Sequence, residues 1–181
     1  MKFRETALPG AFVIEPETLE DKRGFFARVW CRKEFEEHGL VATIAQANTS
    51  FNARAGTLRG MHYQVAPHEE TKVVRCTRGS LYDVIVDLRP DSVTYGNWTG
   101  IELTATNHTM LYVPAGFAHG FITLEDNTEV SYLISAAYAP QAARAVRWND
   151  PAFNIEWPRP VEEISDRDAG WPDFADNTAK P

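Results

Sequence analysis

Hydrophobic and polar residues alternate along this chain in short runs that recur at intervals of about ten residues. The runs are rich in β-branched and aromatic side chains and end at Gly, Pro, Asn or Asp, a pattern typical of an all-β sandwich or barrel. Only residues 31–40 have a helical pattern, with Gly39 as the C-cap, and this helix is too short to change the fold class. The expected strands cover residues 12–16, 24–30, 43–50, 57–64, 71–79, 81–88, 98–103, 109–114, 116–123 and 128–135.

Length and composition fit one domain. With 181 residues, 44% of them hydrophobic, the chain can bury a sizeable core, and a second domain is not expected. The segment 151–181 is rich in Pro, Trp and Asp and lacks strand periodicity, so we expect an irregular C-terminal tail that packs over the sandwich. The sequence thus predicts a single domain over residues 1–181.

The net charge of −7 at pH 7 argues against binding to nucleic acids or to an anionic membrane surface. No stretch approaches the roughly 18 consecutive apolar residues of a membrane-spanning helix, and the first residues lack the apolar segment of a signal peptide. Cys31 and Cys76 lie far apart without CxxC spacing, which disfavours a zinc ribbon or a disulfide scaffold. We therefore expect a cytoplasmic protein without nucleic-acid or membrane partners, in which a few placed Arg and Lys residues hold any anionic ligand.

Side-chain alternation places one ionisable residue on an otherwise apolar face in each of three strands: His62, Lys72 and Tyr132. A lone His or Tyr on such a face is more often a hydrogen-bonded core residue, and an inward Lys more often reaches water from an edge strand. If the three converge, they supply a base, a cation for a developing oxyanion and a phenolic acid. Such a set moves protons next to a carbonyl group.

The segment "VPAGFAHGF" resembles the second sequence motif of the cupin superfamily, with matches at Pro114, Gly116 and His119. The first cupin motif ordinarily brings a His-x-His pair and a downstream Glu, which complete a metal site with the second-motif His. Here His62 is followed by "YQ", and the nearby His68, Glu69 and Glu70 do not restore the spacing. We therefore expect a cupin-like shape without a metal.

Several segments together resemble the dTDP-4-dehydrorhamnose 3,5-epimerase family: "RGFFARVW", "GTLRGMHYQ", "KVVRCTRGSLYDVIVDLRPDSVTYGNW", "YVPAGFAHGFITL", "YAPQAARAVRWNDPAFNIEWP" and "ISDRD". The resemblance extends from about Arg23 to Asp168. It implies a jelly-roll, cupin-like β-sandwich that forms a homodimer, needs no cofactor and acts on a nucleotide-sugar substrate in deoxysugar biosynthesis.

The resemblance also implies roles for single residues. His62 matches the general base, Asp168 the acid that orients it, Lys72 the cation beside the keto oxygen, and Tyr132 the proton donor on the opposite face. Tyr138 matches an aromatic residue that stacks on the nucleotide base. The positions expected to bind substrate are Arg23, Gln46, Asn48, Arg59, Lys72, His119, Tyr138 and Arg167.

Two positions differ from the pattern of this family, since Arg28 and Ala143 stand where acidic residues are usual at the nucleotide end. dTDP is the expected nucleotide, with another nucleotide or deoxyhexose as the alternative.

Strand alternation raises two further questions. Arg59 falls on the opposite face from His62, which a bulge at Gly60 or a ligand contact from a neighbouring subunit would resolve. Asp83 shares a face with apolar residues, so it lies at an exposed edge or in a polar cavity.

Three functions follow as hypotheses. The first is a cofactor-independent epimerase that inverts C3 and C5 of a 4-keto-6-deoxyhexose, or a relative that inverts one of these carbons. The second is a metal-dependent cupin enzyme that uses His62 and His119, which stoichiometric bound metal would favour. The third is a non-catalytic cupin that binds sugar nucleotides. The presence of both Lys72 and Tyr132 speaks against the third, because a protein that only binds has no need of an acid and a base on opposed faces.

Overall fold

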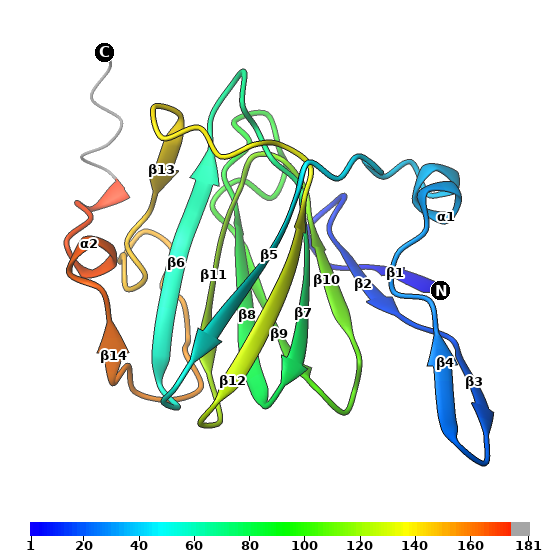
Figure 1. Ribbon diagram of the computed structural model, residues 1–181. Helices are drawn as coiled ribbons and strands as arrows, with labels where there is room; N and C mark the ends of the chain where they lie inside the picture. The colour runs from blue at the N-terminus through cyan, green and yellow to red at the C-terminus, as the bar shows by residue number, and fades with distance from the viewer. Residues whose placement is uncertain (175–181) are drawn as a thin grey trace.

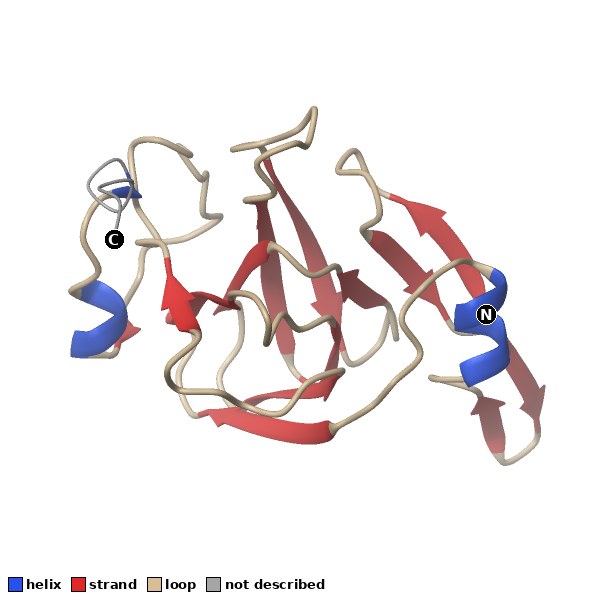
Figure 2. Ribbon diagram, turned by 90° about the horizontal axis from the view of Figure 1, so that it is seen from above, coloured by secondary structure: helices blue, strands red, loops and turns tan. Residues whose placement is uncertain are grey.

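Two β-sheets face each other and enclose the core of the protein (Figures 1 and 2). The computed structural model describes residues 1–174. One sheet has the strand order β1-β2-β10-β7-β12-β5, and the other has the order β13-β6-β11-β8-β9, with β14 paired to β6. Apart from the parallel β14–β6 pair, the strand pairs are antiparallel. The predicted all-β, cupin-like sandwich is confirmed.

The first sheet, here called the front sheet, consists of β1 (Lys2–Glu5), β2 (Phe12–Glu15), β5 (Gln46–Asn52), β7 (Lys72–Arg78), β10 (Met110–Val113) and β12 (Thr128–Ile134). The second, the back sheet, consists of β6 (Thr57–Gln64), β8 (Ser80–Asp87), β9 (Trp98–Thr104), β11 (Phe117–Thr123), β13 (Ala143–Ala145) and β14 (Glu163–Ile164). The strand predicted at residues 57–64 matches β6 at both ends. The strands that the sequence did not reveal, among them β1, β13 and β14, are short, and too few residues repeat in them for a periodicity to be seen.

The main core lies between the two sheets. Val74, Leu111 and Val130 from the front sheet pack against Ile85 and Phe121 from the back sheet, and all five are at most 2% exposed. Burial of this kind is worth about 1.5–3 kcal/mol for each large apolar side chain. The apolar faces predicted by alternation are therefore the inner faces of the sandwich.

The helix α1 (Arg32–Glu37) lies within the segment predicted to be helical. Gly39 follows it with φ of +70°, and its N–H donates to the carbonyl oxygen of Glu36 at 3.0 Å, which closes the last turn as expected of a C-cap glycine. Phe35 anchors the helix in a second apolar cluster on the outside of the front sheet. Neither helix in residues 1–174 has the length and apolar composition required to cross a membrane.

A hairpin of β3 (Thr18–Asp21) and β4 (Gly24–Ala27) projects from the sandwich on the side of α1 (Figure 1). The strand predicted at residues 24–30 ends at Ala27, after which the chain turns into α1. Leu19 and Phe26 on this hairpin are each 69% exposed, so the hairpin offers apolar surface that the rest of residues 1–174 does not cover.

The C-terminal segment lies at the other end of the molecule (Figures 1 and 2). Phe153, Ile155 and Trp157 pack against the outer face of the back sheet. The segment contains two elements that its composition did not predict, β14 and the short helix α2 (Asp166–Ala169), which starts at the N-cap residue Ser165. Residues 175–181 of the predicted tail lie outside the described part of the chain.

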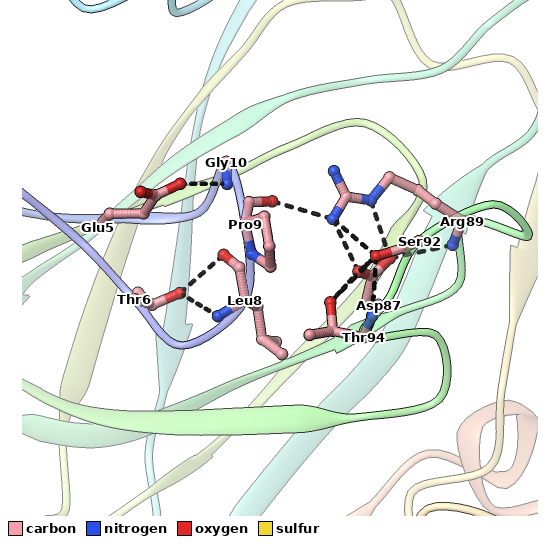
Figure 3. A network of polar contacts seen from close by, with 9 residues as sticks. All are labelled: Glu5, Thr6, Leu8, Pro9, Gly10, Asp87, Arg89, Ser92 and Thr94. Atoms are coloured by element: carbon pink, nitrogen blue, oxygen red, sulfur yellow. Dashed lines mark hydrogen bonds and ion pairs between the residues drawn. The ribbon is translucent and has the colours of Figure 1, made fainter.

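Two buried acids on β8 have different roles. Asp87 is fully buried and accepts hydrogen bonds from Arg89, Ser92 and Thr94, and the Arg89 guanidinium also donates to the carbonyl of Pro9 (Figure 3). Burial opposes the charge on Asp87, but these donors outweigh it and hold the pKa of the carboxyl well below its usual range. Through Arg89, Asp87 thus connects the loop after β8 to the N-terminal segment. Asp83, on the same strand, points into the sandwich.

Candidate functional site

A cavity of about 380 Å³ opens between the front sheet and β6, β11 and β13 of the back sheet, within the size range of small-molecule sites. Every site residue predicted from the sequence lines this cavity except Arg23. The front sheet contributes Gln46, Asn48, Lys72 and Tyr132; the back sheet contributes Arg59, His62 and His119; α2 contributes Arg167 and Asp168, and a loop contributes Tyr138.

His62 forms a close pair with Asp168. The imidazole Nε2 lies 2.7 Å from Asp168 Oδ1, and the other carboxylate oxygen accepts from the backbone N–H of Gly60 at 3.3 Å. Burial alone would raise the pKa of Asp168, but the hydrogen bond and charge of His62, with smaller contributions from Gly60 and Arg167, hold it below its usual value. An ionised Asp168 accepts the Nε2–H of a neutral imidazole, which leaves the basic lone pair on Nδ1.

The position of Asp168 follows from the start of α2. The Asp168 N–H donates to the hydroxyl of Ser165 at 3.1 Å, and the preceding β14 pairs in parallel with the start of β6. Because β14 pairs with β6, the strand that carries His62, the C-terminal segment places Asp168 next to His62.

A β-bulge at Gly60 answers the question that Arg59 raised. His62 pairs with His119, but Arg59 pairs with Phe121, so β6 has one more residue than β11 across this interval. A Cβ on Gly60 would lie 2.4 Å from the Cα of Gly120, and the φ of Gly60 is +134°, so the close approach requires glycine. The extra residue turns the Arg59 side chain toward the same cavity as His62. The Nε of Arg59 donates to Asn52 Oδ1 at 2.7 Å.

Lys72 lies on β7, a strand with neighbours on both sides, and is only 8% exposed. An edge-strand lysine that reaches water is therefore the wrong interpretation. Its Nζ donates to the carbonyl oxygen of His62 at 3.3 Å and lies 3.0 Å from the carboxylate of Glu70. In the sequence, Glu70 stands out only as a possible metal ligand with the wrong spacing. The feature that could have predicted its pairing with Lys72 is its position two residues before that lysine.

Tyr132 lies on β12, across the cavity from His62. Its hydroxyl is 3.1 Å from the hydroxyl of Ser50, and its ring is partly buried against the main core. Burial raises the pKa of the Tyr132 phenol, the charge of Asp83 adds to the shift, and Ser50 and Arg59 partly oppose it. Tyr132 is thus a neutral phenol that can donate a proton. Ser50 carried no signal in the sequence beyond its place on a strand.

His119 and Asp83 form a second buried pair. Their Nε2 and Oδ1 atoms are 2.7 Å apart, and the two residues are 5% and 0% exposed. Asp83 is therefore in the polar interior and not at an exposed edge. The ring of His119 meets that of Tyr132 edge to face, with centroids 6.4 Å apart, and so connects the two walls of the cavity.

The two histidines of the metal hypothesis lie opposite each other on β6 and β11, but a carboxylate engages Nε2 of each. Among residues 1–174, no group of three His, Cys, Asp or Glu side chains is placed to hold a metal ion. Nothing in this arrangement favours the metal-dependent enzyme.

Tyr138 lies at the rim of the cavity and is 57% exposed. Its backbone N–H donates to Gln46 Oε1 at 2.9 Å, which fixes the loop that carries the ring. Ala143 and Arg144 also line this part of the cavity, and no motif or periodicity in the sequence points to Arg144. Arg28 lies elsewhere, in an ion pair with Glu34 at 2.8 Å.

Arg23 is the one predicted site residue outside the cavity. It lies in the turn of the β3–β4 hairpin, where its guanidinium pairs with Asp21 at 2.5 Å and its side chain is 85% exposed. Because the hairpin and α2 lie at opposite ends of the molecule, Arg23 does not reach the cavity of its own chain (Figure 1).

Comparison with known proteins agrees with these observations. A family model described as dTDP-4-dehydrorhamnose 3,5-epimerase matches residues 5–176. A relative of that name from Sinorhizobium fredii is 40% identical over 177 residues, which make up 97% of this chain and 91% of the relative. The crystal structure of dTDP-4-dehydrorhamnose 3,5-epimerase from Bacillus anthracis, with TDP and PPi bound, has a TM-score of 0.92 and 42% identity over 96% of this chain and 99% of that chain. A 3'-monoepimerase from Streptomyces bikiniensis, in complex with dTDP-quinovose, has a TM-score of 0.86 and 34% identity over 94% and 86% of the two chains.

Proposed function

Because the chain belongs to the dTDP-4-dehydrorhamnose 3,5-epimerase family, we propose that it inverts C3 and C5 of a nucleotide-activated 4-keto-6-deoxyhexose without a cofactor. The proposed conversion is that of dTDP-4-dehydro-6-deoxy-D-glucose to dTDP-4-dehydro-L-rhamnose. The observation that carries the proposal is that a base, His62, and an acid, Tyr132, stand on opposite walls of one cavity. Inversion needs this arrangement, since the proton leaves from one face of the sugar and returns on the other.

The reaction uses one site for both carbons, because C3 and C5 both flank the C4 carbonyl. Nδ1 of His62 takes the proton from carbon, and the electrons of the C–H bond move to the carbonyl oxygen to form an enolate. The ammonium of Lys72 stabilises the oxyanion, a contribution of about 3 kcal/mol or more. Tyr132 then donates its proton to the opposite face of the carbon, and the carbonyl forms again. Exchange of protons with solvent restores His62 and Tyr132.

Asp168 supports this step through His62. Its carboxylate holds the ring by Nε2 and stabilises the imidazolium that forms when Nδ1 takes the proton. Because the pKa of Asp168 is low, the carboxylate stays ionised as His62 becomes charged. The pair therefore acts as a base without transfer of a second proton.

The remaining cavity residues fit the charges of a sugar nucleotide. Arg59 and Arg167 supply cations for the diphosphate, and Gln46, Asn48 and His119 supply polar contacts to the sugar. Tyr138 at the exposed rim is placed to stack on the base. Ala143 contributes no charge at this rim, and Arg144 contributes a positive one.

We also infer that the protein acts as a homodimer in the cytoplasm. The exposed apolar side chains of the β3–β4 hairpin, Leu19, Phe25 and Phe26, are suited to cover by a second copy. A dimer would also give Arg23 its expected role, because a hairpin that reaches the other subunit could present Arg23 to that subunit's cavity. Sedimentation analysis of the protein and of a Phe26→Asp variant tests this inference, and a wild-type monomer would refute it.

The experiment that tests the function is proton NMR of dTDP-4-keto-6-deoxyglucose with chelator-treated protein in deuterated buffer. Enzyme-dependent incorporation of deuterium at C3 and C5 is the expected result. Incorporation at one carbon would identify a mono-epimerase. Absence of exchange at both, with binding demonstrated by calorimetry, would refute the proposal for this substrate and direct the test to other nucleotide sugars.

A further inference from the structure

Glu70 is a carboxylate in the cavity that the proposed mechanism does not use. It lies in the loop between β6 and β7, and its Oε1 is 3.0 Å from Lys72 Nζ. The side chains of Glu70 and Lys72 are 11% and 9% exposed, so the ion pair is shielded from water and its interaction is stronger than that of a surface pair.

Hydrogen bonds fix the loop on both sides of Glu70. The Gln64 side chain donates to the carbonyl of His68 at 2.9 Å. On the other side, the N–H of Thr71 donates to Ser135 Oγ at 2.8 Å, and the N–H of Ser135 donates to the carbonyl of Thr71 at 3.1 Å. Glu70 is thus held over Lys72 by contacts of its neighbours and does not depend on the ion pair for its place.

The other charged groups around the cavity do not pair with Lys72. The titratable or charged groups that line it besides Glu70 and Lys72 are Arg59, His62 and Tyr63 on β6, His119 on β11, Tyr132 on β12, Tyr138, Arg144 on β13, and Arg167 and Asp168 on α2, with Asp83 on β8 directly behind His119. The arginines repel an ammonium, and the carboxylates of Asp168 and Asp83 are engaged by His62 and His119. Within residues 1–174, Glu70 is the carboxylate that pairs with Lys72.

We infer that Glu70 is a positioning residue that holds the Lys72 ammonium in place and directs it at the substrate's keto oxygen. The inference rests on the proposed function, since it assigns to Lys72 the stabilisation of the enolate. An ammonium has three hydrogens, so Lys72 retains capacity for the substrate oxygen beside its contacts with Glu70 and the His62 carbonyl. Without Glu70, the buried ammonium of Lys72 would lose its carboxylate partner, and its Nζ would have more freedom.

The test compares Glu70→Gln with Glu70→Asp and with Glu69→Gln, which neutralises the exposed neighbouring carboxylate and is the matched control. In Glu70→Gln we expect kcat to fall at least tenfold with little change in KM, because Lys72 is misdirected in the transition state while substrate binding is kept. Glu70→Asp keeps the carboxylate and should lose less kcat, and Glu69→Gln should leave kcat and KM unchanged.

A second measurement does not need turnover. In protein labelled with [13Cε]lysine, the Lys72 resonance, assigned with Lys72→Arg, should move and narrow in Glu70→Gln as the side chain gains mobility. If wild-type protein fails to exchange C3 and C5 protons, the proposed function is wrong, while this resonance still reports on the pair.

An unchanged Lys72 resonance, or a changed resonance with unaffected kcat, would overturn the inference. Should Glu70→Gln not fold, Glu70→Asp decides the question, because a wild-type kcat in that variant would mean that the placement of the carboxylate does not matter.

Discussion

Replacement of Tyr132 by Phe tests the division of labour between the two walls of the cavity. The phenyl ring keeps the edge-to-face contact with His119 and the burial of the side chain, and only the hydroxyl and its contact with Ser50 are lost. One such hydrogen bond contributes about 1 kcal/mol to stability, so the variant should fold. Proton abstraction by His62 should persist, whereas return of a proton on the opposite face should fail.

The expected loss follows from the value of a positioned acid. General acid catalysis is worth about 10²–10⁴-fold in rate, or about 3–5 kcal/mol of activation free energy, and inversion should slow by this factor. In deuterated buffer, NMR should show incorporation of deuterium at C3 with retention of configuration, because the enolate collapses by reprotonation from the His62 side. Inversion by Tyr132→Phe at a rate near that of wild type would refute the assignment, and loss of both exchange and binding would mean that Tyr132 is structural.

Three further predictions concern the supports of the site and the fold. Asp168→Asn should lower kcat about 10⁴-fold while calorimetry detects unchanged nucleotide-sugar affinity, since the amide favours the wrong tautomer of His62; a loss below tenfold would contradict the proposed pair. Gly60→Ala should destabilise the protein by about 3 kcal/mol or more in urea unfolding, because its Cβ would meet Gly120 and its φ is positive, and wild-type stability would show that β6 can straighten. Asp87→Asn should cost about 3 kcal/mol at pH 7. The pKa of Asp87 in the folded protein lies below the ordinary value of 3.8, so its stabilising contribution is present above that pH and is lost as the pH falls through the folded value; the difference between wild type and variant should therefore shrink in acid.

Strand alternation predicted much of the fold and the centre of the site. It placed His62, Lys72 and Tyr132 on inward faces because a period of two needs only local sequence. The same rule was wrong for Arg59, since the register shift depends on the approach of Gly60 to Gly120, a contact between strands far apart in the chain.

Partnerships across the chain were harder to predict than single positions. Asp168 was assigned to His62 only through resemblance, because no periodicity links a four-residue helix to a strand over a hundred residues earlier. The sequence shows Asp83 and Glu70 as acids, but their pairing with His119 and Lys72 depends on sheet pairing and loop anchoring, which the sequence pattern does not contain.

The base and the acid of the proposed reaction belong to different sheets, so nothing covalent and no strand register sets the gap between them. The hydrophobic layer that separates the two sheets, which includes Val130 and Phe121, therefore contributes to that gap. Facing sheets pack about 10 Å apart, and a change of one methyl group in the layer between them alters that spacing. Turnover of this protein should therefore respond to hydrostatic pressure and to conservative core substitutions remote from the sugar, with the apolar interior acting as the spacer that sets the reach of the two catalytic walls.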